Sequence, residues 1–186
     1  MRSSIMAWVL SLGGFNVYLL KDGYKSYRKW TENILAIRTK LIVLGGMTGS
    51  GKTELLSQLA LLGEQVIELE KIASHKGSAF GGLGQNPQPS NEHFENELAL
   101  VYSRLDYNRY VWIENESRKI GNNKVPDFLF EQMQTAPLVE ISILQTVRLQ
   151  RILAEYASFP TEQLAETTKK ISKRLGNLKL KESLTQ

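Results

Sequence analysis

From residue 40 to the C-terminus, short apolar runs alternate with stretches in which apolar residues recur every three or four positions. Residues 41–44 form a continuous apolar run, which is typical of a strand buried on both faces of a parallel sheet. Further strands are expected at 65–69, 110–113 and 138–143, and helices at 52–62, 91–105, 147–156 and 161–175. This alternation predicts an α/β fold with a doubly wound, mainly parallel sheet.

Residues 1–30 follow a different pattern. An apolar stretch at 4–12, ended by Gly13-Gly14, predicts a short helix. Residues 15–20 predict a strand, Asp22-Gly23 a turn, and residues 24–30 the start of another helix. Because one strand cannot form a sheet alone, residues 1–30 are predicted to be an appendage of the main domain or the end of another domain. Residues 31–39 are predicted to be a linker, and 40–186 the main domain.

The chain has 186 residues and no cysteine, so disulfides, zinc-thiolate sites and a cysteine nucleophile are excluded. Its longest apolar run near the N-terminus, residues 5–12, is far shorter than the ~20 residues that span a bilayer. This run lacks a small-residue cleavage site, so it is not predicted to be a signal peptide. We therefore expect a cytoplasmic protein without a membrane partner.

The formal net charge is +4, and basic residues gather near the C-terminus. They predict either a surface that meets nucleic-acid phosphates or a solvated helix face, and charge alone favours the second interpretation. The residues concerned are Arg148, Arg151, Lys169, Lys170, Lys173, Arg174, Lys179 and Lys181.

A glycine-rich segment joins the strand expected at 41–44 to the helix expected at 52–62. It has the spacing of a phosphate-binding P-loop, in residues Gly46, Met47, Thr48, Gly49, Ser50, Gly51, Lys52 and Thr53. Glycines let backbone N–H groups turn towards phosphate oxygens, and the helix N-terminus faces the same anion. Lys52 is predicted to be catalytic by neutralising the terminal phosphate, and Thr53 to bind Mg²⁺. An ordinary glycine-rich turn is the alternative to this P-loop NTPase-like domain.

P-loop proteins usually place an acid near the metal, at the end of a neighbouring strand. Glu114 follows the strand expected at 110–113 and is the first candidate for a catalytic, metal-side acid, with Glu116 and Glu70 as further candidates. A surface carboxylate at a strand end is the alternative for Glu114. Arg118 follows closely enough in sequence to reach the same cleft and is a second catalytic candidate. Arg148 and Arg151 predict either phosphate-clamping cations or part of a solvated helix face.

Residues 74–90 form a polar, glycine-rich stretch that is long for a loop, and such loops are usually functional or disordered. Four of its residues combine cations, a hydroxyl and a glycine and predict a second anion or substrate site. They are His75, Lys76, Gly77 and Ser78. A flexible polar loop without such a site has a similar composition.

Together these residues resemble the tRNA 2-selenouridine synthase family over nearly the whole chain. The P-loop with Glu54-Leu55-Leu56 is similar to the family's P-loop segment, and more specific blocks follow in order. These are LE at 69–70, HKGSAFG at 75–81, QPS at 88–90, HFEN at 93–96 and WIENESRKIG at 112–121. Residues 2–8 and 15–25 look like the end of the rhodanese-like domain that precedes the P-loop domain in this family, so residues 1–30 would be a partial rhodanese-like segment.

The resemblance implies a tRNA partner and two reactions at 2-thiouridine in the wobble position. These are S-geranylation from geranyl diphosphate, and then replacement of the geranylthio group by selenium from selenophosphate. Both donors carry phosphate, so the P-loop does not by itself require ATP, although Mg²⁺ fits it. The family's catalytic cysteine would fall just before Met1, so selenation is expected to need a separate rhodanese-like domain or subunit.

Two other functions stay open. Gly49, Arg148 and Arg151 also fit a small kinase-like ATP-dependent phosphotransferase or NTPase. The missing part of the rhodanese-like domain also fits a non-catalytic remnant or binding module. ATP turnover in the absence of tRNA would favour the first function, and turnover on thiolated tRNA would exclude the second.

Overall fold

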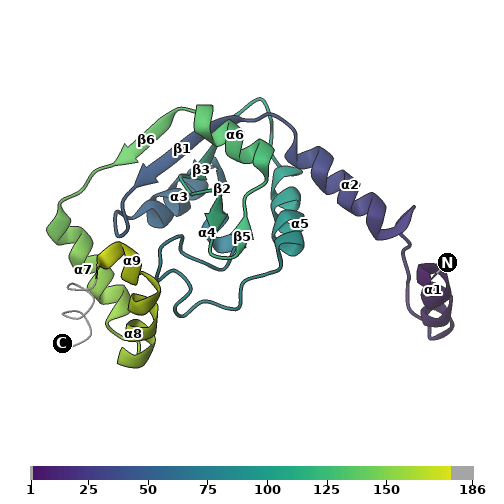
Figure 1. Cartoon of the computed structure of the whole chain (residues 1–186). Helices are drawn as coiled ribbons and strands as arrows, with labels where there is room; N and C mark the ends of the chain where they lie inside the picture. The colour runs from purple at the N-terminus through teal and green to yellow at the C-terminus, as the bar shows by residue number, and fades with distance from the viewer. Residues whose placement is uncertain (1, 177–186) are drawn as a thin grey trace.

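A four-stranded parallel sheet forms the centre of the molecule in the computed structural model, which describes residues 2–176 (Figure 1). Its strands are β1 (Lys40–Gly46), β2 (Gln65–Ile67), β3 (Tyr110–Glu114) and β6 (Leu138–Ile141), in the order β2-β3-β1-β6. The short strands β4 (Lys119–Ile120) and β5 (Asn123–Lys124) form a separate antiparallel pair. In the register of the sheet, Leu44 of β1 lies opposite Glu114 of β3.

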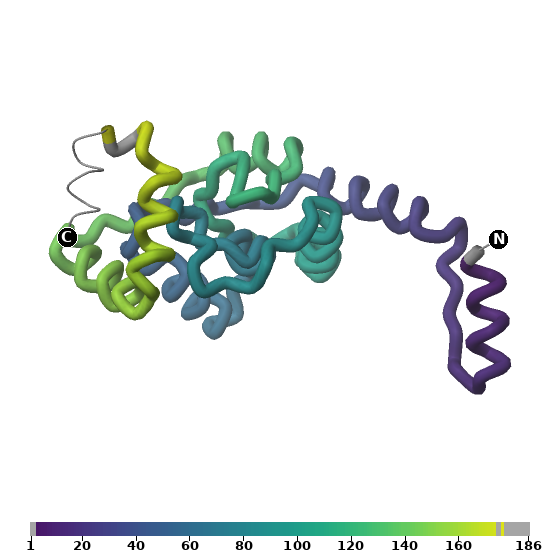
Figure 2. The backbone as a smooth tube through the Cα atoms, turned by 60° about the horizontal axis from the view of Figure 1, so that its bottom comes forward, coloured from purple at the N-terminus to yellow at the C-terminus, as the bar shows by residue number. Residues whose placement is uncertain are grey.

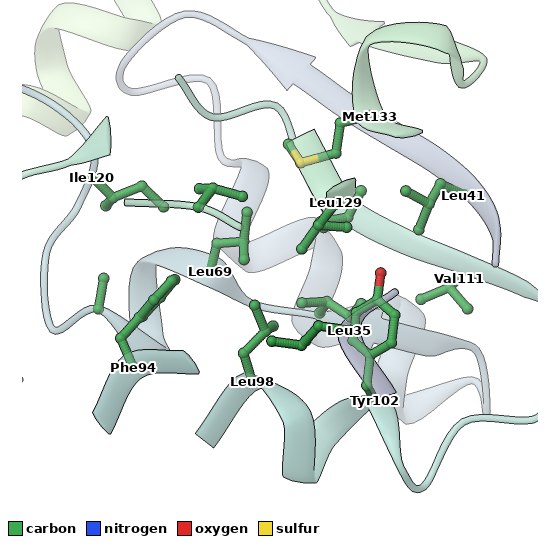
Figure 3. Close-up of a cluster of buried hydrophobic side chains, with 14 of the residues drawn as sticks. Leu35, Leu41, Leu69, Phe94, Leu98, Tyr102, Val111, Ile120, Leu129 and Met133 are labelled. Atoms are coloured by element: carbon green, nitrogen blue, oxygen red, sulfur yellow. The ribbon is translucent and has the colours of Figure 1, made fainter. Parts of the chain in front are cut away.

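Helices cover both faces of the sheet, as the alternating pattern predicts. The side chains of Leu41 and Val43 belong to a core that includes α5 (Asn91–Tyr102) and α6 (Asp127–Thr135), shown in Figure 3. Because successive residues of a strand point to opposite faces, Leu44 faces the other side. Helix α3 (Lys52–Leu61), which contacts β1, β2 and β3, buries Leu56 completely. The predicted doubly wound α/β fold is therefore confirmed.

Several element boundaries differ from the prediction. Strand β2 ends at Ile67, because the short helix α4 (Leu69–Ile72) begins where the strand was expected to finish. Helix α7 (Gln145–Tyr156) matches its prediction closely, whereas the helix expected at 161–175 is interrupted at Ile171 into α8 (Thr161–Lys170) and α9 (Ser172–Leu175). Helix α5 begins at Asn91, as predicted, and the hydroxyl of its N-cap residue Ser90 accepts a hydrogen bond from His93 N–H at 3.2 Å. Lys179 and Lys181 of the basic cluster lie outside the described residues.

The N-terminal helices α1 (Arg2–Leu12) and α2 (Gly23–Leu35) extend from one end of the sheet domain, with α1 at the far end of α2 (Figures 1 and 2). The strand predicted at 15–20 is wrong: these residues run back beside α1 (Figure 2) and pair with no strand among the described residues. An isolated strand leaves its backbone groups without ladder partners, so it gains nothing from the extended conformation. Along residues 2–176, none of the helices has the length and apolar character needed to cross a bilayer.

Helix α2 continues into the segment predicted to be a linker and is attached to α5. The Arg28 side chain donates to Asn96 Oδ1 at 2.6 Å and pairs with Glu95, and Asn96 Nδ2 donates to the Tyr24 hydroxyl at 2.9 Å. Thr31 is buried in this contact. The assignment of residues 1–30 to a rhodanese-like remnant, with 31–39 as a linker, stays a prediction.

Candidate active site

The P-loop connects the end of β1 to the N-terminus of α3 at the carboxyl edge of the sheet. In the strand order, the connection that follows β1 runs to β2 in one direction, and the connection that follows β3 runs to β6 in the other. Open α/β sheets bind ligands at the carboxyl ends of strands whose connections diverge in this way. Gly49 and Gly51 have φ values of 78° and 89°, which L side chains rarely adopt. Gly51 is the N-cap of α3 and has no side-chain hydrogen bond there, so the N-terminal N–H groups of α3 are available to an anion.

Two P-loop side chains have internal arrangements that a bound phosphate would change. The Lys52 ammonium donates a hydrogen bond to the Gly46 carbonyl at 3.0 Å, so it is folded back over the loop. The Ser50 hydroxyl is buried and has no hydrogen-bond partner among the described residues. Thr53 is exposed at the start of α3. The loop therefore holds a cation, an unsatisfied hydroxyl and helix N–H groups around one position.

Glu114 lies at the end of β3, next to the P-loop strand, as predicted for a metal-side acid. Its side chain is fully buried, and Oε2 accepts a hydrogen bond from Glu70 N–H at 2.8 Å. Oε1 has no partner within the described part of the chain. Burial raises the pKa of Glu114 to about 7, against the opposing effect of the Glu70 N–H bond and the Lys52 charge. The surface alternative for Glu114 is excluded, because this carboxyl is inaccessible to solvent.

Two further glutamates lie beside Glu114. Burial, followed by the charges of Glu114 and Glu116, raises the pKa of Glu70 to about 8, and burial also raises the pKa of Glu116. Both side chains lie against Gly77, where a Cβ would approach the Glu116 and Glu70 carboxyl oxygens to 2.5 and 2.7 Å. From the sequence, Glu70 and Glu116 were only alternatives to Glu114 as the metal-side acid. The fold instead brings all three carboxyls together beside Lys52.

A cavity of about 610 Å³ opens over the P-loop. Residues 47–54 form one wall. The remaining walls come from α4, the loop that follows it, and α7, and they carry Glu68, Glu70, Lys71, Lys76, Gln85, Arg151, Glu155 and Tyr156. Such a volume accommodates a small-molecule ligand. Gln85, Glu155 and Tyr156 had no signal in the sequence, because nothing in an amphipathic helix or a polar loop reveals that it faces a distant P-loop.

The four residues of the predicted second anion site do not all line the P-loop cavity. Lys76 lines the cavity and forms an ion pair with Glu155. The His75 ring instead packs under a glycine-rich turn, with its Cε1 3.0 Å from where a Cβ on Gly81 would lie, and burial lowers its pKa. The Ser78 hydroxyl is buried. Of the four predicted residues, only Lys76 lines the cavity.

The three arginines of the prediction have different positions. Arg118 is directed away from the P-loop, because the chain turns there into the β4-β5 pair. Its guanidinium is 3.2 Å from Asp127 and stacks over the Phe130 ring of α6 at 5.2 Å. Arg148 and Arg151 of α7 both reach the P-loop, Arg148 at its outer backbone and Arg151 inside the cavity.

Comparison with known proteins places the chain in a family. A family model described as the tRNA 2-selenouridine synthase AAA domain matches residues 39–186. A tRNA 2-selenouridine synthase of Sulfurovum sp. is 36% identical over 205 aligned positions, which cover 97% of this chain and 54% of that protein. Those of Shewanella denitrificans and Cupriavidus pinatubonensis are both 34% identical over 84% of this chain, and they are covered to 42% and 43% of their own lengths.

The chain thus spans about half the length of the relatives that it matches. The matched segment contains the whole P-loop domain with its cavity. The fold, the P-loop and this similarity agree, and the chain belongs to the tRNA 2-selenouridine synthase family, with residues 39–186 as its AAA domain.

Proposed function

We propose that this chain is a tRNA-modifying transferase domain that acts on 2-thiouridine at the wobble position, with a phosphate-bearing donor bound at the P-loop. One observation carries the proposal: blocks far apart in the sequence meet around a single cavity. Lys52, Glu70 and Lys76 line it, and Glu114 lies beside Glu70 at the end of β3. The relatives are named for synthesis of 2-selenouridine in tRNA, and tRNA is the proposed partner.

The donor is geranyl diphosphate for geranylation and selenophosphate for selenation. In geranylation the sulfur of 2-thiouridine attacks the carbon that carries the diphosphate, an S–C bond forms, and the C–O bond breaks with its electron pair going to the diphosphate. The base then loses its N3 proton to water, which leaves a neutral S-geranyl product. Lys52 and the N–H groups at the start of α3 stabilise the charge that develops on the leaving oxygens. ATP hydrolysis has no part in this step.

Within residues 2–176 no group of three or more His, Asp or Glu side chains is arranged to hold a metal ion, so a magnesium ion at the P-loop would depend mainly on the phosphates of the donor. Mg²⁺ keeps several waters and is usually bound by one or two carboxylates together with substrate phosphates, and Glu114 has an unpartnered oxygen. Glu114 and Thr53 would hold the ion, which would supply further charge neutralisation at the phosphates. The family resemblance implies a rhodanese-like cysteine for selenation, and the given sequence contains no cysteine, so a rhodanese-like domain or subunit is the proposed second partner.

The test is incubation of the chain with 2-thiouridine tRNA and geranyl diphosphate, followed by mass spectrometry of the nucleosides. We expect a mass gain of one geranyl group, and loss of that product with Lys52→Ala. A chain that leaves 2-thiouridine unchanged under conditions where it binds both tRNA and donor would refute the transferase and favour a binding module.

A small kinase-like phosphotransferase or NTPase is the second candidate, favoured by the arginines that α7 brings to the P-loop. Release of ADP from ATP in the absence of tRNA, with or without a small nucleoside acceptor, would support it. No ADP release together with geranylation would exclude it.

A further inference from the structure

The two arginines of α7 approach the P-loop from different sides. Arg148 Nε donates to the Thr48 carbonyl at 3.1 Å, and its guanidinium also lies 2.8 Å from the Met47 sulfur. Arg148 is thereby occupied with the outer backbone of the loop. Arg151 lines the cavity, and its guanidinium lies so close over Gly51 that a Cβ at this position would collide with it.

Each cation of the cavity wall outside the P-loop has a carboxylate neighbour. Lys76 pairs with Glu155, Lys71 lies 3.2 Å from Glu68, and Arg151 NH2 lies 3.6 Å from Glu54 Oε2. Of these three cations, Arg151 has its guanidinium against the P-loop, over Gly51. It is therefore placed to share a ligand with Lys52.

We propose that Arg151 is the second phosphate-binding cation of this site, held by Glu54 until a ligand with two linked phosphates displaces that carboxylate. The proposal rests on the proposed donor site at the P-loop and names its ligand class as an organic diphosphate. The loop N–H groups and Lys52 surround one phosphate. Arg151, which enters from α7 across Gly51, binds the second.

The chemistry of the Arg151–Glu54 pair suits such an exchange. The two side chains are 46% and 72% exposed, and ion pairs this exposed contribute little to stability, so they are easily separated. A guanidinium binds phosphate through two parallel N–H bonds, which an ammonium does not provide. A ligand with a single phosphate places that phosphate in the loop and offers no second phosphate to Arg151.

The experiment measures the affinity of the full chain for inorganic phosphate, inorganic pyrophosphate and geranyl diphosphate by calorimetry, at one Mg²⁺ concentration and ionic strength. Arg151→Ala is expected to weaken both diphosphates at least about tenfold and phosphate less than about threefold, because only the second phosphate loses a charge-assisted hydrogen bond. Arg151→Lys is expected to fall between the wild type and Arg151→Ala. Glu54→Gln is expected to strengthen pyrophosphate binding about threefold, because it removes the competing carboxylate.

Arg109→Ala is the matched control. Arg109 is 51% exposed, lies 4.0 Å from Glu64 and is not among the residues that line the cavity. Its replacement removes the same charge and is expected to change pyrophosphate affinity less than about twofold. Circular dichroism establishes that each variant is folded.

Equal losses for phosphate and pyrophosphate in Arg151→Ala would overturn the proposal, as would an unchanged pyrophosphate affinity. If Lys52→Ala abolishes binding and Arg151→Ala does not weaken it, only the role of Arg151 fails. If the wild type binds none of the three probes, or Lys52→Ala binds them as well as the wild type, the donor site at the P-loop fails as well.

Discussion

Replacing Glu114 with glutamine is expected to stabilise the protein at alkaline pH. The Glu114 carboxyl is fully buried, and its pKa rises from the ordinary value of 4.5 to about 7. At ~1.4 kcal/mol per pKa unit, ionising it costs the folded state about 3 kcal/mol. Glutamine has nearly the same shape, carries no charge and keeps an oxygen to accept the Glu70 N–H bond. Because its amide N–H₂ takes the place of the unpartnered oxygen, we expect a net gain of about 2 kcal/mol.

The direction of the pH dependence follows from the raised pKa. The folded protein holds the Glu114 proton more tightly than the unfolded chain, so wild-type stability is greatest below about pH 4.5 with respect to this group and falls as the pH rises towards 7. Glu70, with a pKa of about 8, extends the fall to higher pH. In Glu114→Gln the part of this fall due to residue 114 is absent.

Urea unfolding at a series of pH values, without phosphate or Mg²⁺, measures the effect. The variant should match the wild type near pH 4.5 and exceed it by about 2 kcal/mol at pH 8. Glu131→Gln, an exposed site on α6, is the control and should stay within about 0.5 kcal/mol of the wild type throughout. A flat wild-type profile between about pH 5 and 8, or a Glu114→Gln variant that is less stable at pH 8, would refute the reasoning.

Three further predictions concern single sites. Gly51→Ala should weaken pyrophosphate binding at least about tenfold in calorimetry, because φ is 89° and the new Cβ meets Arg151; wild-type affinity would contradict the loop geometry. Arg118→Ala should change pyrophosphate affinity less than about twofold, because its partner is Asp127 and not the cavity; a tenfold loss would return Arg118 to the site. Leu56→Ala should lower the free energy of unfolding in urea by about 2–4 kcal/mol, and Leu61→Ala, which is 79% exposed, by under about 0.5; equal losses would contradict the packing of α3.

The local features of the candidate site could be predicted from the sequence. The P-loop is read directly, because its glycines, Lys52 and Thr53 are consecutive and their spacing follows from the geometry of a strand, a tight turn and a helix. Glu114 could be proposed because it follows an apolar strand, and the register of β1 and β3 then places it beside the loop. Arg118 was proposed for the site only because it lies near Glu114 in the sequence. The chain turns into the β4-β5 pair at this point, and Arg118 pairs with Asp127 instead.

The sequence by itself determined the class of fold and the position of the P-loop, because hydrophobic periodicity and glycine spacing act over a few residues. It did not determine the strand order, in which β3 lies between β1 and β2. That order decides that Glu114 adjoins the P-loop, and the path of the chain after β6 brings α7 with Arg151 across it. These positions come from packing between segments up to a hundred residues apart, and no local pattern encodes them. The strand predicted at 15–20 is absent for the same reason, because a strand forms only where the tertiary structure places another strand beside it.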